Sequence, residues 1–330
     1  MTQGRGRRGP IRLVLGIAVS AIFAALTVSR VDVAEVGAAF ARVNFGVVLL
    51  AVPVVGLELL LRAIRWQRLL QPIAPVALRR SVAYLAIGYF ANSLLPARLG
   101  DVARAFLAGR AFDISRLTVL GTIVVERLAD GVFILAVVAV LGLTVAGGAS
   151  LASTALLLGV LGVAGLAILT AALWWVRRPG GGRLRTSLRS FVDRVLLGVE
   201  GVRDPSVAIP TVVLTVAAFT TAVAMFSIVA SAAGSGLSLA QCALVMGGLA
   251  LSTSIPAGPG SIGTYEFVGL TILTSLGLDP ESSLAIVVIV HLVVTVPLAI
   301  AGLAAAWQLH FRFSEIAQDV DPSGLAEGPA

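Results

Sequence analysis

The sequence predicts an all-α polytopic membrane protein with six transmembrane helices and two re-entrant helical hairpins, arranged as an inverted-topology repeat. The first observation behind this fold class is composition: 58% of the 330 residues are hydrophobic, 12% are charged, and the mean hydropathy is +1.00. A soluble domain carries about 25% charged residues and could not keep so much apolar surface out of water. Because no segment alternates like a barrel strand, we expect a helical bundle.

The second observation is a repeated pair of helix breaks. Residues 93–101 read S-L-L-P-A-R-L-G-D, and residues 253–261 read T-S-I-P-A-G-P-G-S. Each interrupts an apolar run with proline, which removes a backbone donor, and with glycine, which leaves the backbone unconstrained. Broken apolar segments at corresponding positions of two halves indicate the binding site of a secondary transporter.

The third observation is the distribution of arginine. The predicted cytoplasmic segments hold nearly all of the loop arginines, as the positive-inside rule expects, and only Arg30 and Arg42 fall in a predicted outer loop. The net charge of +7 therefore reports membrane topology and does not indicate nucleic-acid binding. We expect a multi-pass protein of the cytoplasmic membrane with both termini in the cytoplasm.

The first repeat covers residues 11–143 and follows a basic cytoplasmic N-terminus, residues 1–10, that we expect to be disordered. Ile11–Val28 is the first span; a signal peptide is the alternative, although no clear cleavage site follows the run. Residues 31–43 form a short amphipathic connection outside, and Asn44–Leu61 is the second span. This span delivers five arginines to the cytoplasm, namely Arg62, Arg65, Arg68, Arg79 and Arg80.

A re-entrant hairpin over residues 81–109 comes next. Its first helix, residues 81–95, is about 22 Å long at 1.5 Å per residue and is too short to cross a bilayer comfortably. A break at 96–100 then leads into a second short helix over 101–109. Leu117–Leu143 crosses to the outside, and it carries three ionisable residues, Glu126, Arg127 and Asp130.

The inverted second repeat covers residues 151–307. Leu151–Val176 returns inward, and the basic cytoplasmic loop 177–206, with an amphipathic helix over 184–199, could touch anionic lipid headgroups. The remaining segments are the outward span Val207–Ala230, the hairpin 239–277 with its break at 255–261, the inward span Leu284–Trp307 and the polar cytoplasmic tail 308–330.

Each predicted half reads span, span, hairpin, span, and the two halves begin on opposite sides of the membrane. The two hairpins therefore enter from opposite faces and meet near the midplane. Irregular backbone at this depth is tolerated only where it is buried in protein or lines a wet cavity. We expect both hairpin breaks to face one internal cavity.

The residues around the breaks predict an anionic ligand such as a lipid phosphate. Helices that start at Asp101 and Ile262 would aim their positive N-terminal ends at the cavity, and Arg98 and Arg104 would add fixed positive charge. The predicted substrate-binding residues are Arg98, Asp101, Arg104, Glu126, Arg127, Asp130 and Glu266. The predicted hairpin-break residues are Pro96, Gly100, Pro256, Pro259, Gly260 and Gly263.

An ionisable residue inside a span costs about 2.5–3.5 kcal/mol on insertion scales and therefore needs a partner. Glu126, Arg127 and Asp130 could pair with Arg98, Asp101, Arg104 or Glu266, and a static ion network that fixes the hairpins is the alternative to a binding role. Glu58 and Arg62, four residues apart, can pair at the membrane surface.

Other chemistry is not expected. Gly258–Gly263 matches G-x-G-x-x-G, but no strand precedes it and no acidic residue follows at the required distance. His291 is interpreted as a packed, hydrogen-bonded histidine in an apolar span. The single Cys242 allows no internal disulfide. We predict no enzyme activity, no cofactor, no metal site and no nucleic-acid partner.

Three stretches in order resemble a known family. Residues 92–104 (N-S-L-L-P-A-R-L-G-D-V-A-R), the motif Glu126-Arg127-x-x-Asp130 and residues 255–266 (I-P-A-G-P-G-S-I-G-T-Y-E) resemble signatures of the lysylphosphatidylglycerol synthase transmembrane region, a flippase-like family. The resemblance covers roughly residues 10–310 and implies a membrane protein that handles a lipid. In two-domain members this region is held to flip aminoacylated phosphatidylglycerol. With no synthase domain expected here, the resemblance does not imply that this chain makes that lipid.

The leading hypothesis is a translocase that moves an anionic or aminoacylated phospholipid, or a polyprenyl-linked lipid, through a polar midplane cavity. A small-solute or ion-coupled transporter of the same inverted-repeat type is the second. The third is a non-transporting scaffold that positions a separate lipid-modifying enzyme through the basic loop. A cavity that opens laterally between spans would favour the first hypothesis, and a cavity sealed from lipid would favour the second.

Overall fold

The computed structural model of the chain describes residues 8–95, 99–145, 174–175, 178, 183–255 and 257–310, and every regular element in these ranges is a helix. Three described segments are long and apolar enough to cross a membrane: Phe45–Leu70, Pro205–Ala232 and Pro280–Gln308. A fourth arises if the first two helices, bent by 81° at their junction, count as one span. The chain is thus an all-helical membrane protein, whereas six spans in an inverted repeat stay a prediction.

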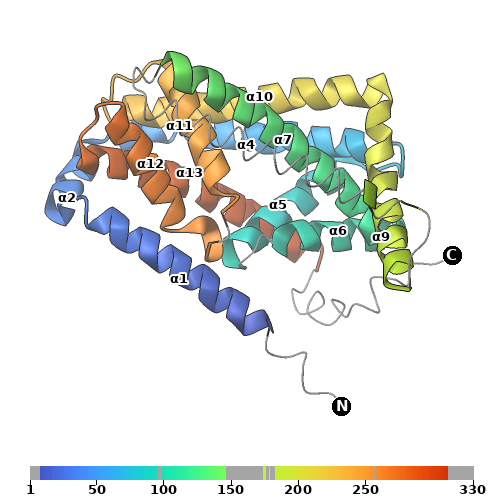
Figure 1. The fold of residues 1–330 in the computed structure, drawn as a ribbon. Helices are drawn as coiled ribbons and strands as arrows, with labels where there is room; N and C mark the ends of the chain where they lie inside the picture. The colour runs from blue at the N-terminus through green and yellow to red at the C-terminus, as the bar shows by residue number, and fades with distance from the viewer. Residues whose placement is uncertain are drawn as a thin grey trace.

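The described elements follow the predicted order along the chain (Figure 1). They are α1 (Arg8–Val28), α2 (Val33–Arg42), α3 (Phe45–Val48), α4 (Ala51–Leu70), α5 (Leu78–Leu94), α6 (Leu99–Phe112), α7 (Arg116–Thr144), α9 (Arg183–Glu200), η2 (Gly201–Arg203), α10 (Pro205–Ala232), α11 (Leu239–Ser252), η3 (Pro259–Ser261), α12 (Thr264–Ser275) and α13 (Pro280–Gln308). Most of the predicted span Leu151–Val176, the N-terminal residues 1–7 and the tail after residue 310 lie outside the described residues.

Local capping fixes where several helices begin. The Asp204 carboxylate accepts a hydrogen bond from the Ser206 amide at 2.8 Å at the start of α10, and this bond lowers the pKa of Asp204. Asp279 accepts from the Ser282 amide in the same way at the start of α13. Pro205 and Pro280 take the first helical position, where a missing amide hydrogen costs nothing. The N-terminal ends of these helices are therefore encoded locally.

The exposed faces of the long helices are apolar, as a lipid environment requires. α13 exposes Leu292, Val296, Ile300 and Leu303, which are three or four residues apart and form one stripe along the helix. Its opposite face buries apolar side chains too, including Val290, which is fully buried. A helix that is hydrophobic all round belongs in a core or in a membrane, and this stripe lies on the surface.

The helix of the second predicted span does not end at Leu61. α4 continues to Leu70, so Arg62 and Arg65 lie inside the helix and not in a cytoplasmic loop. The Arg65 side chain is 2% exposed. The helix tolerates these charges because carboxylates on neighbouring helices neutralise them, which hydropathy along one segment cannot reveal.

The first predicted hairpin forms two packed helices, α5 and α6, that approach each other closely. A Cβ atom on Gly100 would lie 1.9 Å from the carbonyl oxygen of Gly88, so glycine is required at this crossing. The Gly100 amide also donates to the Asn92 side chain at 2.8 Å. Pro96 and Arg98, at the break itself, lie outside the described residues.

The second pair of short helices, α11 and α12, is joined by an irregular break that contains η3. Gly260 and Gly263 adopt φ values of +66° and +90°, a region that side chains with a Cβ rarely occupy. A Cβ on Gly263 would also lie 2.4 Å from the Ser20 carbonyl oxygen of α1. The glycines of the rejected dinucleotide pattern thus serve backbone geometry. Pro256 lies outside the described residues.

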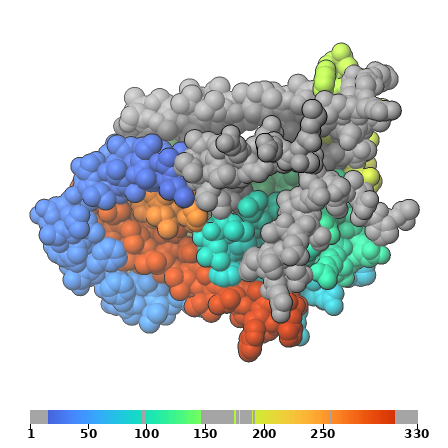
Figure 2. All heavy atoms as spheres, turned by 90° about the horizontal axis from the view of Figure 1, so that it is seen from below, coloured from blue at the N-terminus to red at the C-terminus, as the bar shows by residue number. Residues whose placement is uncertain are grey.

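The helices pack in pairs that are distant in sequence. α4 packs along α10, α5 along α13, and α7 against both α9 and α11. On the face drawn in Figure 2, α1 (blue) lies beside the C-terminal helices (orange), in agreement with the packing of α1 on α12. The largest buried apolar cluster joins α4, α10, α11, α12 and α13 around Met225 and Phe226. This core holds both sides of the break in α11–α12 against the long helices.

Candidate functional site

Residues beside both helix breaks line one cavity of about 560 Å³. Asn92 and Ser93 contribute from the end of α5, and Thr253, Ser254 and Gly260 contribute from the break after α11. A Cβ placed on Gly260 would lie 3.7 Å from the Ser93 carbonyl oxygen, so the second break lies close to the end of α5. Residues of both predicted hairpins thus share one cavity, while residues 96–98 of the first break lie outside the described residues.

The cavity wall carries an exposed ion pair between α7 and α6. Arg127 donates to Asp101 through Nη2 to Oδ1 at 2.7 Å and through Nε to Oδ2 at 3.1 Å, which is a two-pronged geometry. The two side chains are 37% and 20% exposed, and both line the cavity. This pairing was among those predicted from sequence, and it places a guanidinium fork and a carboxylate side by side at the cavity surface.

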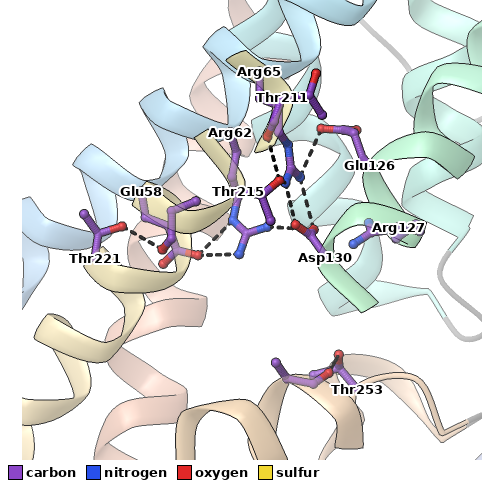
Figure 3. A network of polar contacts seen from close by, with 12 residues as sticks. Glu58, Arg62, Arg65, Glu126, Arg127, Asp130, Thr211, Thr215, Thr221 and Thr253 are labelled. Atoms are coloured by element: carbon purple, nitrogen blue, oxygen red, sulfur yellow. Dashed lines mark hydrogen bonds and ion pairs between the residues drawn. The ribbon is translucent and has the colours of Figure 1, made fainter. Parts of the chain in front are cut away.

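A second set of charges forms an alternating chain that joins α4, α7 and α6. Figure 3 shows its centre, where side chains from α4 and α7 point toward one another. In order of contact its members are Glu58, Arg62, Asp130, Arg65, Glu126 and Arg104. Opposite charges alternate along the whole chain, so every member neutralises its neighbours.

The exposed end of this chain borders the cavity. Arg62 donates through Nε to Glu58 Oε1 at 2.8 Å and through Nη1 to Asp130 Oδ2 at 3.2 Å. Asp130 also receives two hydrogen bonds from Arg65, which links the exposed end to the buried end. Glu58, Arg62 and Asp130 all line the cavity.

The buried end of the chain lies behind the cavity wall. Arg104 Nη2 donates to Glu126 Oε2 at 2.5 Å, and its guanidinium lies 4.4 Å from the centre of the Trp66 ring. Arg65 Nη1 also donates to the Thr215 hydroxyl of α10 at 2.8 Å. Arg65 and Arg104 are 2% exposed and Glu126 is 3% exposed. These three residues tie α4, α6, α7 and α10 together.

Two predictions about this group need correction. Arg104 was expected to face a ligand phosphate, but its guanidinium is buried against Glu126 and Trp66, and neither Arg104 nor Glu126 lines the cavity. Glu266 was expected as a partner of the group around Glu126, but it bonds elsewhere. Burial is the physical reason in the first case, since a guanidinium at 2% exposure has no surface to offer a ligand.

Glu266 connects the second break to α13. Its Oε2 accepts a hydrogen bond from the Gly263 amide at 2.6 Å, where α12 begins, and its Oε1 lies 2.5 Å from His291 Nδ1. The His291 ring stacks obliquely on Tyr265 with 4.4 Å between ring centres. His291 and Tyr265 line the cavity. The interpretation of His291 as a packed, hydrogen-bonded histidine holds, although the sequence did not reveal that its partner is Glu266.

Sequence reasoning missed three residues of the site: Arg62 and Arg65 as network members, and His291 as a cavity residue. A signal for the first two was present, since Glu58, Arg62 and Arg65 are spaced four and three residues apart and so share one face of a helix. Arg98, a predicted ligand residue, lies outside the described residues. Within the described part of the chain, no group of three His, Cys, Asp or Glu residues is placed to hold a metal ion.

An open apolar groove of about 710 Å³ lies between α7, α10 and α11. Its described lining residues are Ala136, Val137, Val140, Leu141, Phe219, Thr220, Val223, Ala224, Leu239 and Ala243. Apart from the Thr220 hydroxyl, these side chains offer only hydrocarbon surface. The polar cavity and the apolar groove therefore share two of their walls, α7 and α11.

Comparison with known proteins agrees with this geometry. No curated protein sequence matches the chain. Residues 13–302 match the family described as the lysylphosphatidylglycerol synthase TM region. The match includes every described residue of the cavity, the ion network and the groove. The chain therefore belongs to the lysylphosphatidylglycerol synthase transmembrane region family, a family of membrane proteins related to lipid handling.

Proposed function

We propose that the chain is a lipid translocase. A phospholipid or polyprenyl-linked lipid would place its headgroup in the polar cavity and part of its hydrocarbon in the apolar groove while it crosses the membrane. The observation that carries this proposal is that the polar cavity and the apolar groove both have walls on α7 and α11. A ligand with one polar and one apolar end fits such a pair of sites.

The change from polar to apolar lining follows the helical register. On α7, Asp130 and Ile134 line the cavity and Val137 and Leu141 line the groove. These positions are three or four residues apart, so they form one stripe along the helix that changes from polar to apolar. An amphiphile lying along this stripe keeps its charge beside Asp130 and its chain beside Leu141.

The facing helix α11 repeats the pattern. Ala250 and Met246 line the cavity, and Ala243 and Leu239 line the groove, again at three- or four-residue spacing. α7 and α11 are in close contact, since a Cβ on Gly247 would lie 2.6 Å from Val138. Both helices therefore carry a stripe that lines the polar cavity at one end and the apolar groove at the other.

Headgroup binding would proceed by exchange of ion pairs. The Arg127 fork, released from Asp101, suits the oxygens of a phosphate, and Asp101 can then accept a hydrogen bond from an amine or a hydroxyl of the same headgroup. Each charged group has a partner of opposite charge throughout the exchange, so no charge is left unpaired inside the membrane. Arg62 and Asp130 offer a second exposed pair at 3.2 Å on the same wall.

The buried charges would have a different role. Arg65, Arg104 and Glu126 hold α4, α6, α7 and α10 in fixed relation, which provides a rigid wall. Access would then alternate by movement of the other helices against this wall. This division assigns transport to the exposed pairs and stability to the buried ones.

Reconstitution in proteoliposomes tests the proposal against the solute-transporter alternative. Fluorescent phosphatidylglycerol, aminoacylated phosphatidylglycerol and phosphatidylethanolamine report lipid crossing through loss of signal to a membrane-impermeant quencher. The corresponding water-soluble glycerophospho headgroups are tested for uptake. Lipid crossing without headgroup uptake is expected, because only a ligand with a hydrocarbon chain gains the groove. Headgroup uptake without lipid crossing would overturn the proposal in favour of a solute transporter.

A further inference from the structure

The pair formed by His291 on α13 and Glu266 on α12 has no part in the headgroup binding described above, and His291 lines the same cavity. His291 occupies an apolar stretch of α13, with Val and Ile before it and Leu, Val and Val after it. An ionisable residue in such a stretch is expensive, and it commonly marks a substrate or proton path. We propose that His291 and Glu266 are a proton-binding site that couples proton movement to lipid movement, an inference that rests on the proposed function.

The geometry leaves one ring nitrogen for the proton. Glu266 as a carboxylate can only accept hydrogen bonds, and it already accepts from Gly263, so Nδ1 of His291 carries the hydrogen that points to Oε1 at 2.5 Å. A second proton therefore binds at Nε2, and it converts the pair into an imidazolium and a carboxylate. His291 lines the cavity, so a proton can arrive from the same space as the headgroup.

Glu266 transmits the change to the helix break. Its other oxygen holds the Gly263 amide at 2.6 Å, at a residue whose φ of +90° only glycine adopts without strain. The break is also tied to α1, because the Gly258 amide donates to the Ser20 hydroxyl at 2.9 Å. A charged imidazolium strengthens the hold on Glu266, and a neutral one weakens it, so proton binding biases how firmly this break is fixed.

The surrounding charges make the coupling favourable for an anionic headgroup. The ionisable side chains that share the cavity are Glu58 and Arg62 on α4, Tyr89 on α5, Asp101 on α6, and Arg127 and Asp130 on α7. Tyr265 on α12 stacks on the histidine ring, and α2, which also packs on α13, carries Glu35 and Arg42. Protonation adds one positive charge to this set, which favours entry of a phosphate by Coulomb attraction.

One transport cycle is then a symport, in which a proton and the lipid move in the same direction. A proton binds at Nε2 of His291 while the cavity faces one side, and the anionic headgroup enters beside it. The N–H bond breaks when the cavity faces the other side, and the proton leaves from the same atom with the lipid. The pair ends in the neutral-imidazole form in which it began, so a pH gradient can drive net lipid movement.

The first test measures proton binding to His291 directly and does not require lipid transport. Nitrogen NMR of the protein labelled at its histidines gives two imidazole signals, and His291→Gln assigns them, with exposed His310 as the internal control. We expect the His291 nitrogen signals to change when a proton binds, and Glu266→Gln to shift the pH at which they change while the His310 signals stay the same. No titration, or a midpoint that Glu266→Gln does not move, overturns the proton site even if no lipid is transported.

The second test reads coupling in proteoliposomes with an imposed pH gradient. Wild type should move anionic lipid faster with the gradient than without it, and His291→Gln should lose this dependence on the gradient. Lipid crossing in wild type that ignores the gradient would overturn the coupling and leave the proposed translocase standing. Failure of wild type to move any lipid would instead remove the proposed function, and the NMR titration alone would then decide the proton site.

Discussion

Arg127 on α7 donates hydrogen bonds to both carboxylate oxygens of Asp101 on α6, at 2.7 Å and 3.1 Å. Both residues line the cavity beside the helix breaks. The pair differs from the neighbouring Arg104–Glu126 pair, which has similarly short contacts but is buried behind the wall. A strong, two-pronged ion pair left at a cavity surface is available for exchange with a ligand. The two pairs are therefore expected to respond differently to substitution.

Glu126→Gln is expected to destabilise the protein and not primarily to change ligand binding. The substitution leaves Arg65 and Arg104 buried with one carboxylate fewer between them, and breaking a buried pair costs about 3–5 kcal/mol. Thermal unfolding in detergent should show a clear fall in Tm. Arg127→Gln is the matched control, and because its pair is only part-buried, stability should fall less than in Glu126→Gln. Equal falls for both variants would contradict the division between buried and exposed pairs.

Gly100→Ala is expected to force α5 and α6 apart. The new methyl group would lie 1.9 Å from the Gly88 carbonyl oxygen, so the backbone has to move, at a cost of about 1–3 kcal/mol or more. Gly37→Ala on α2 is the control, because nothing lies within 4 Å of its added Cβ and alanine stabilises a helix by about 0.5–1 kcal/mol relative to glycine. Unfolding midpoints of the two variants should move in opposite directions, and a neutral Gly100→Ala would show that the hairpin crossing is looser than described.

Ala136→Trp is expected to slow lipid crossing by filling the groove while leaving the cavity intact. Ala136 is exposed in the groove, so the indole can be accommodated without entering the core. If the indole displaces only two methylene groups of the lipid chain from the groove, at about 0.8 kcal/mol each, the lipid binds about tenfold more weakly. Ala41→Trp, on the exposed face of α2, serves as the control in the same lipid-crossing assay. An unchanged rate in Ala136→Trp would mean that the acyl chain does not use this groove.

Much of the fold was predictable because its signals are local. The break at Gly260 follows from proline and glycine in an apolar run, and α11 begins at Leu239, where the sequence predicted the second hairpin to start. The pairing of Arg127 with Asp101 was anticipated because an ionisable residue in a span needs a partner. These inferences depend on chemistry within a few residues or on one general rule.

The rest depended on which helices pack together. Arg65 looked like the start of a cytoplasmic loop because its partners, Glu126 and Asp130, lie on α7 and are invisible in the hydropathy of α4. Arg104 looked available to a ligand because it follows a break, yet Trp66 and Glu126 cover it. The groove could not be predicted at all, since it exists only where α7, α10 and α11 meet. Long-range packing therefore decides which charges are exposed.

The central claim is that the exposed Arg127–Asp101 pair handles the headgroup of a transported lipid. It is tested most directly by comparing lipid crossing in proteoliposomes for wild type, Arg127→Gln and the control Arg42→Gln, which removes an exposed arginine on α2. Loss of a charge-assisted hydrogen bond should slow Arg127→Gln about 10- to 100-fold, with Arg42→Gln close to wild type and all three equally folded. An Arg127→Gln protein that moves lipid as fast as wild type would contradict the account.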